Sequence, residues 1–155
     1  MCIESLSAVL EREHREIDAG FERFAACVDD GDVVALRRAI AVLRRHIYVE
    51  EERVFPMLRE HGLFAPLLVM LREHGQIWDS IDQVERELET DAATSSRLCH
   101  QLLVQLQHHN GKEERIIYPQ ADQALTPREA VELVTFLQDG ELPAGWVCAK
   151  AGLAR

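Results

Sequence analysis

The chain has 155 residues, of which 47% are hydrophobic and 28% are charged, a balance typical of a water-soluble domain that can bury a core. Its formal net charge of −10 argues against a nucleic-acid-binding protein, which normally carries a basic surface. No apolar stretch approaches the roughly 18 residues of a membrane span, and the N-terminus becomes charged too early for a signal peptide, so we expect a cytoplasmic protein without a membrane partner.

Helical periodicity runs through most of the sequence. Apolar residues recur every three or four positions in four successive segments, at 7–28, 33–58, 64–88 and 95–121. Polar or glycine-containing breaks separate them at 29–32, 60–66 and 89–96. No segment shows the alternating pattern of a half-buried strand. The sequence therefore predicts four long amphipathic helices joined by short loops.

A shorter fifth helix is predicted at about 127–139. Thr126 is a suitable N-cap, Pro127 suits the first helical position, and Glu129 completes a capping-box sequence. The segment 140–155, which contains Trp146 and Cys148, is expected to form a tail packed on the body. We predict a single all-α domain over 1–155, an antiparallel up-down four-helix bundle over about 3–123 followed by the fifth helix.

The sequence contains an internal repeat. REHREI at 12–17 matches REHGQI at 72–77, and HIYVEEERVFP at 46–56 matches HNGKEERIIYP at 109–119. In the second pair the histidine, the glutamates four and five residues later, the aromatic residue and the proline all coincide. The order is the same in both halves, which indicates two related helical hairpins that each carry half of a site.

The spacing within the repeat suits metal coordination. Residues four apart lie on one helix face, so the histidine and the first glutamate of each long motif can point to one centre. Imidazole and carboxylate ligands suit iron, manganese or zinc. The shorter motifs add one histidine from each of the other two helices. The predicted metal ligands are His14, His46, Glu50, His74, His109 and Glu113. Six ligands with two potentially bridging carboxylates favour a two-metal centre.

The spacing of the motif distinguishes His109, as the candidate ligand, from its neighbour His108. Four residues after His108 stands Lys112, which repels a cation, whereas four residues after His109 stands Glu113. His108 is therefore interpreted as a neighbour or surface residue, about 100° round the helix. His61 and His100 have no matching partners and are left out of the site.

The remaining residues of the motifs are given structural interpretations. Glu51, Glu52 and Glu114 are interpreted as a solvated helix face. The prolines ten residues after each motif histidine, Pro56 and Pro119, are expected to end or kink their helices beyond the site. Ile17 and Ile77 either wall the site or simply belong to the core.

The doubled motif resembles the hemerythrin-like, or HHE cation-binding, family over about residues 8–125. The resemblance implies four antiparallel helices around a non-haem di-iron centre with oxo or hydroxo and carboxylate bridges. It also implies that His14, His46, His74 and His109 are terminal ligands and that Glu50 and Glu113 bridge. Oxygen-carrying members have a fifth histidine and a terminal aspartate, which this chain lacks. The set of four histidines and two glutamates is more similar to members linked to iron–sulfur cluster repair, nitric oxide stress and iron sensing.

Counting ligands leaves one position on each metal open, unless Glu51, Glu114, Tyr48 or another carboxylate fills it. We therefore expect a di-iron protein that binds, senses or reacts with O2, NO or peroxide, in stress response or iron homeostasis. Two alternatives stay open: an oxidoreductase that consumes peroxide or NO, and a helical bundle stabilised by zinc. No redox cysteine pair or flavin motif identifies an electron donor, and the catalytic residues and protein partners are not specified by the sequence.

Overall fold

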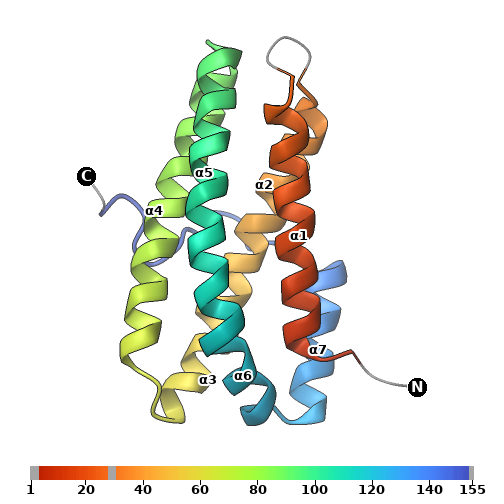
Figure 1. The fold of residues 1–155 in the computed structure, drawn as a ribbon. Coiled ribbons are helices and arrows are strands. Elements are labelled where there is room, and N and C mark those ends of the chain that lie inside the picture. The colour runs from red at the N-terminus through yellow and green to blue at the C-terminus, as the bar shows by residue number, and fades with distance from the viewer. Residues whose placement is uncertain (1–3, 28–30, 154–155) are drawn as a thin grey trace.

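The computed structural model describes residues 4–27 and 31–153, and over these residues the chain is all-α, as predicted. Four long helical rods lie side by side in an antiparallel, up-down arrangement (Figure 1). The first rod is α1 (Leu6–Ala25) and the third is α4 (Ala65–Leu88). The second consists of α2 (Val33–Val49), η1 (Glu50–Val54) and α3 (Phe55–Glu60); the fourth consists of α5 (Ala92–Lys112), η2 (Glu113–Ile117) and α6 (Tyr118–Ala124).

Local sequence signals set the helix ends. Asp32 and Asp91 cap α2 and α5 through their side chains, which accept backbone N–H groups of the first turn. The second rod ends at Gly62, whose φ of +89° is the left-handed conformation that glycine adopts without strain. The N–H of Leu63 then donates to the carbonyl of Leu58, and that of Gly62 to the carbonyl of Arg59, a Schellman ending.

The predicted fifth helix is present as α7 (Pro127–Asp139), with the capping box between Thr126 and Glu129 formed. In Figure 1, α7 lies at the lower end of the bundle beside α1. Its buried residues, Leu133 and Leu137, belong to an apolar cluster that includes Leu6, Val9 and Leu10 of α1. Among the residues that the model describes, no helix combines the length and the apolar character needed to cross a membrane.

The prolines do not end the second and fourth rods, so that part of the prediction is wrong. In each rod a turn of π-helix, η1 or η2, ends two residues before the proline, and α3 or α6, which has the proline as its second residue, then continues. The N–H of Phe55 donates to the carbonyl of Glu50, and that of Tyr118 to the carbonyl of Glu113. The wider turn lets the rod pass through a residue that lacks an N–H donor. π turns of this kind often occur at functional sites.

The core consists of two apolar clusters with a polar layer between them. One cluster surrounds Phe21, Leu36 and Ile81 at the end of the bundle near the α1–α2 loop. The other surrounds Leu10, Phe55 and Tyr118 at the end where α3, α6 and α7 meet. On every long rod, the predicted ligands fall between residues of the first cluster and residues of the second. The bundle thus holds its charged side chains in the middle of an otherwise apolar interior.

Candidate metal centre

The structure brings all six predicted ligand residues together in the polar layer. Each rod contributes: α1 and α4 supply one histidine each, and each π-containing rod supplies a histidine and the first glutamate of its π turn. All six residues are buried. One group of potential ligand atoms joins His14, His46, Glu50 and Glu113, and a second joins His74, His109 and Glu113; within each group the atoms lie no more than 4.8 Å apart.

The two central carboxylates face both histidine pairs. Glu50 places Oε1 3.2 Å from Nε2 of His46 and Oε2 3.2 Å from Nε2 of His74. Glu113 places Oε2 3.4 Å from Nε2 of His14 and Oε1 2.9 Å from Nε2 of His109. Each carboxylate therefore offers one oxygen to His14 and His46, the first half-site, and the other to His74 and His109, the second half-site. This is the arrangement that two bridging carboxylates require.

Several polar atoms of this layer lack ordinary partners. Among the described residues, Glu50 Oε2, His74 Nε2 and Glu113 Oε1 are buried without a hydrogen bond. The Nε2 atoms of His14 and His46 lie only 3.1 Å apart. The contacts of the first three atoms with one another and with His109 Nε2, at 2.9–3.4 Å, lack hydrogen-bond geometry, and a buried polar group without a hydrogen bond normally has a further partner such as an ion. A cation among these atoms would satisfy them, and nitrogen and carboxylate oxygen are the donors that iron, manganese or zinc accepts.

A second set of glutamates orients the four histidines. Nδ1 of each ring lies 2.8–2.9 Å from a carboxylate oxygen: His14 with Glu114, His46 with Glu13, His74 with Glu51 and His109 with Glu73. Because an ionised carboxylate only accepts, each Nδ1 carries the proton and each Nε2 is left to face the centre. Such partners fix the tautomer and the ring orientation of metal-binding histidines. We call these four glutamates the outer carboxylates.

The outer carboxylates follow the repeat. Glu13 and Glu73 each precede a histidine and contact the histidine of the next rod, 33 and 36 residues further on. Glu51 and Glu114 each follow a central glutamate and contact a histidine 23 and 100 residues away. The interpretation of Glu51 as solvated is wrong, since its side chain is 3% exposed. Glu114, at 37%, is partly exposed but also paired. The repeat itself could have identified all four, because they coincide in both halves.

Tyr118 enters the first half-site, which the sequence did not predict. Its hydroxyl lies 2.9 Å from His14 Nε2 and 3.2 Å from His46 Nε2, and donates to Glu50 Oε1 at 2.7 Å. At the matching position of the repeat stands Phe55, whose ring stacks on His74 with centroids 5.4 Å apart. The two half-sites therefore differ: the first has an additional oxygen donor, and the second has an apolar ring.

Burial and mutual attraction control the charges of the layer. Burial alone would lower the pKa of His46, but Glu50 and Glu13 outweigh it and raise that pKa to about 10. Burial and the charge of Glu113 would raise the pKa of Glu50, but His46 and His74 lower it to about 2. The pKa of His74 is likewise raised well above its ordinary value, against the effect of burial, by carboxylates that include Glu113, Glu50 and Glu51. A cation entering this layer must therefore displace protons from histidine.

Burial, followed by the charges of Glu113 and Glu50, raises the pKa of Tyr118 well above its ordinary value. The phenol is therefore protonated in the metal-free layer, where it acts as a donor to Glu50. A bound cation would lower the pKa of the phenol, because its positive charge favours the phenolate over the protonated form.

The other histidines lie outside the layer, as expected. His61, His100 and His108 are all exposed, and consecutive residues such as His108 and His109 lie about 100° apart round the α5 helix. Ile17 and Ile77 are fully buried and belong to the apolar cluster next to the layer, which agrees with their interpretation as core residues.

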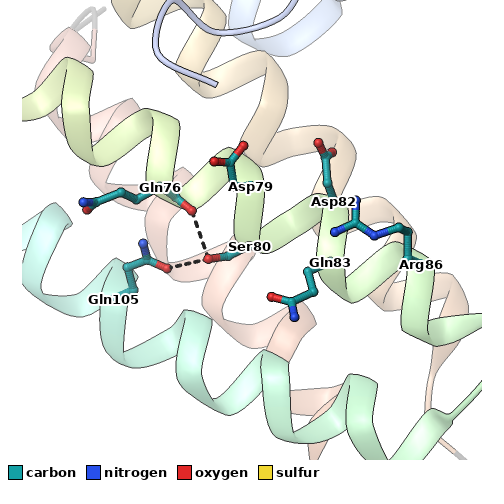
Figure 2. A pocket seen from close by; sticks show the side chains of 7 residues that line it. All are labelled: Gln76, Asp79, Ser80, Asp82, Gln83, Arg86 and Gln105. Carbon is teal, nitrogen blue, oxygen red and sulfur yellow. Dashed lines mark hydrogen bonds between the residues drawn. The ribbon is translucent and has the colours of Figure 1, made fainter. Parts of the chain in front are cut away.

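A surface hollow of about 740 Å³ lies between α4 and α5, away from the polar layer (Figure 2). The Ser80 hydroxyl lies 2.9 Å from the carbonyl oxygen of Gln76 and 3.0 Å from Oε1 of Gln105, which links the two helices. None of the lining residues is a candidate ligand. They are Gln76, Asp79, Ser80, Asp82, Gln83, Arg86 and Gln105.

Comparison with known proteins agrees with this geometry. The family model described as the hemerythrin HHE cation binding domain matches residues 5–121, which include all the candidate ligands and the four rods except the last three residues of α6. Neither the search of curated proteins nor the search of solved structures finds a match.

Proposed function

We propose that this chain, which belongs to the hemerythrin HHE cation-binding family, holds two non-haem iron ions and binds, senses or reacts with O2, NO or peroxide. The observation that carries the proposal is the division of the Glu50 and Glu113 oxygens between two pairs of histidines. Such a division suits two metal ions, because a single ion would use only one oxygen of each carboxylate and one pair of histidines. Iron held there would supply one-electron redox chemistry and a coordination position open to a small ligand.

The residues proposed to hold the ions are His14, His46, His74 and His109 as terminal ligands, with Glu50 and Glu113 as bridges. The outer carboxylates keep each Nε2 directed at the centre, so the rings are oriented before a metal arrives. The phenol of Tyr118 is a further donor for the first half-site, and its contacts with His14 and Glu50 support that role.

The surroundings favour gas or peroxide chemistry over general hydrolysis. The ring of Phe55 stacks on His74 in the second half-site, and Ile77, three residues after His74, belongs to the adjoining apolar cluster; both are essentially inaccessible to solvent. Small uncharged ligands cross such a wall more readily than ions or polar substrates. The open position in the second half-site, where Phe55 replaces the phenol, is therefore the proposed binding position.

Anaerobic loading followed by optical spectroscopy tests the proposal. The protein is loaded with Fe²⁺, freed of excess metal, counted for iron, and then exposed separately to O2, NO and peroxide. We expect about two irons per chain and a near-ultraviolet and visible absorption that changes with at least one reagent. A colourless protein that prefers Zn²⁺ and responds to none of them would instead favour a zinc-stabilised bundle.

A further inference from the structure

The C-terminal tail covers one side of the bundle at the level of the polar layer. The rods α1 and α2 pack closely along their lengths, as do α4 and α5, whereas α2 and α4 touch each other only sparsely. After α7 the chain turns back, passes α2 and ends beside α4 (Figure 1). The tail thus lies along the side where two neighbouring rods are least in contact.

Aromatic packing holds the tail to both rods. The Trp146 ring lies edge-to-face with Tyr48 of α2, with centroids 5.1 Å apart, and with Trp78 of α4, at 5.5 Å. Its indole N–H donates to Glu52 at 3.0 Å. Two residues further on, Cys148 is buried in the apolar core cluster. The tail is therefore an integral part of the packed bundle.

One contact of the tail leads directly to the candidate metal centre. The backbone N–H of Ala149 donates to Oε2 of Glu51 at 2.8 Å, and Oε1 of the same carboxylate lies 2.9 Å from Nδ1 of His74. Glu51 is the most buried of the outer carboxylates, with 3% of its side chain exposed against 8% for Glu13 and 16% for Glu73. Both of its oxygens are occupied, one by the tail and one by the histidine.

Gly75 is the position that admits the tail. A Cβ atom at residue 75 would lie 2.3 Å from the carbonyl oxygen of Lys150, which is too close for any side chain. The matching position in the first half of the repeat is Arg15, which is exposed. The neighbouring N–H of Gly152 donates to Asp79 at 2.8 Å and anchors the end of the described tail to α4. The second half-site alone has a glycine that lets a backbone segment approach its histidine.

We infer that the C-terminal tail positions His74, one of the two histidines of the second half-site. The Ala149 N–H fixes Glu51, and Glu51 fixes the ring of His74 with Nε2 directed at the centre. Ala149 and Glu51 are positioning groups that act through the histidine. The inference rests on the proposed metal centre, and it makes metal binding in the second half-site, but not in the first, dependent on the tail.

Ala149→Pro in the full-length chain removes this one donor. Ala149 is the second residue of a turn closed by the N–H of Ala151 and the carbonyl of Cys148, at 3.2 Å, and proline is favoured at that position. Glu51→Gln tests the same link by another route, because both partners of the carboxylate are donors and an amide has only one accepting atom. Asp79→Ala is the matched control, since it removes a tail anchor with no contact to a histidine.

The readout is binding of Fe²⁺ and Zn²⁺ measured by titration, with helical circular dichroism to verify folding. Losing an outer partner of a metal ligand typically weakens affinity about 10–100-fold. We expect Ala149→Pro and Glu51→Gln to weaken one of two sites by that factor, while Asp79→Ala binds both ions like the wild type. Unchanged binding in both folded variants, or an equal loss in Asp79→Ala, would overturn the inference.

Nitrogen-15 NMR of the metal-free protein separates this inference from the proposed function. In the wild type we expect a slowly exchanging Nδ1 proton on His74, which Ala149→Pro and Glu51→Gln accelerate and Asp79→Ala leaves alone. If the wild type binds no metal, the proposed function fails by itself, and the exchange rates still decide whether the tail positions His74. Equal exchange in all four proteins would contradict the positioning.

Discussion

Each candidate ligand histidine has a separate role for its two ring nitrogens. Nδ1 is committed to an outer carboxylate and Nε2 faces the centre. The rings are consequently oriented in the metal-free protein, and less conformational freedom is lost when a metal binds. The same carboxylates increase the basicity of the rings, which strengthens them as ligands.

Tyr118 is the residue whose role is most easily isolated. We predict that Tyr118→Phe keeps the fold, since Phe55 occupies the matching position of the repeat, but removes the visible phenolate-to-iron absorption of the ferric protein. The measurement is an optical spectrum of iron-loaded protein at matched iron content. Tyr48→Phe is the control, because Tyr48 packs on Phe136 and Trp146 and its hydroxyl makes no hydrogen bond with any candidate ligand within residues 4–27 and 31–153. A visible band that survives in Tyr118→Phe would show that the phenol is not a ligand.

At this scale the sequence predicted which six side chains the structure brings together, but it did not predict the outer carboxylates or Tyr118. The spacing of four identifies side chains on one helix face, and the doubled motif selected His109 over His108. Helical periodicity does not reveal that Glu51 is buried, because its burial depends on the tail, a segment about 98 residues away. Tyr118 was missed because an aromatic residue after a metal motif has the same pattern as a core residue.

The π turns are the main feature at the scale of elements. Each π turn begins at a central glutamate, Glu50 or Glu113. The turn therefore lies between the carboxylate of the site and the apolar residues that follow it. Val54 and Phe55, and likewise Ile117 and Tyr118, still face the interior after the turn. The sequence located the helices from periodicity and caps, but periodicity does not distinguish a π turn from a proline kink.

Two helical glycines give a prediction about packing between elements. A Cβ at Gly20 would lie 2.6 Å from Cβ of Ala39, whereas a Cβ at Gly111 meets nothing closer than 3.6 Å. We predict that Gly20→Ala destabilises the fold, because overpacking costs about 1–3 kcal/mol. Gly111→Ala should stabilise it by about 0.5–1 kcal/mol through helix propensity.

Thermal unfolding of the metal-free variants, followed by circular dichroism, measures both effects. A change of 1 kcal/mol moves the Tm by about 2–4 °C in a chain of this length. Equal stabilisation by the two substitutions would mean that α1 and α2 do not approach closely at Gly20.

At the scale of the whole molecule, a charged layer lies between two apolar clusters, and its response to pH follows from its pKa values. The pKa of His46 is about 10 in the metal-free fold, above the ordinary 6.5, so its stabilising effect is complete below pH 6.5 and is lost as the pH rises toward 10. Metal binding has the opposite dependence, since the metal must displace that proton.

We therefore predict that, between pH 6.5 and 9, the Tm of the metal-free protein falls while its affinity for Zn²⁺ rises. Zinc serves as the probe because it does not oxidise during the titration. His46→Ala should flatten both trends, and the exposed His100→Ala should leave them unchanged. Affinity that is independent of pH would contradict a site built from protonated histidines.

The tail was the least predictable part of the molecule. Its composition indicated packing through Trp146 and Cys148, and both residues do contact the bundle. The sequence did not indicate the surface on which it packs, since the contacts of Ala149 and Lys150 are made by backbone atoms that no residue type specifies. The one hint in the sequence is that Gly75 in the second half of the repeat stands where the first half has Arg15, since a glycine allows another backbone to approach the helix closely.

The central claim is that Glu50 and Glu113 hold two metal ions between two pairs of histidines, and iron counting on the double variant Glu50→Ala with Glu113→Ala tests it most directly. The exposed His108→Ala is the control. After anaerobic loading and removal of loosely bound metal, we predict about two irons per chain in the wild type and the control, and almost none in the folded double variant. Normal iron content in the double variant would contradict the assignment.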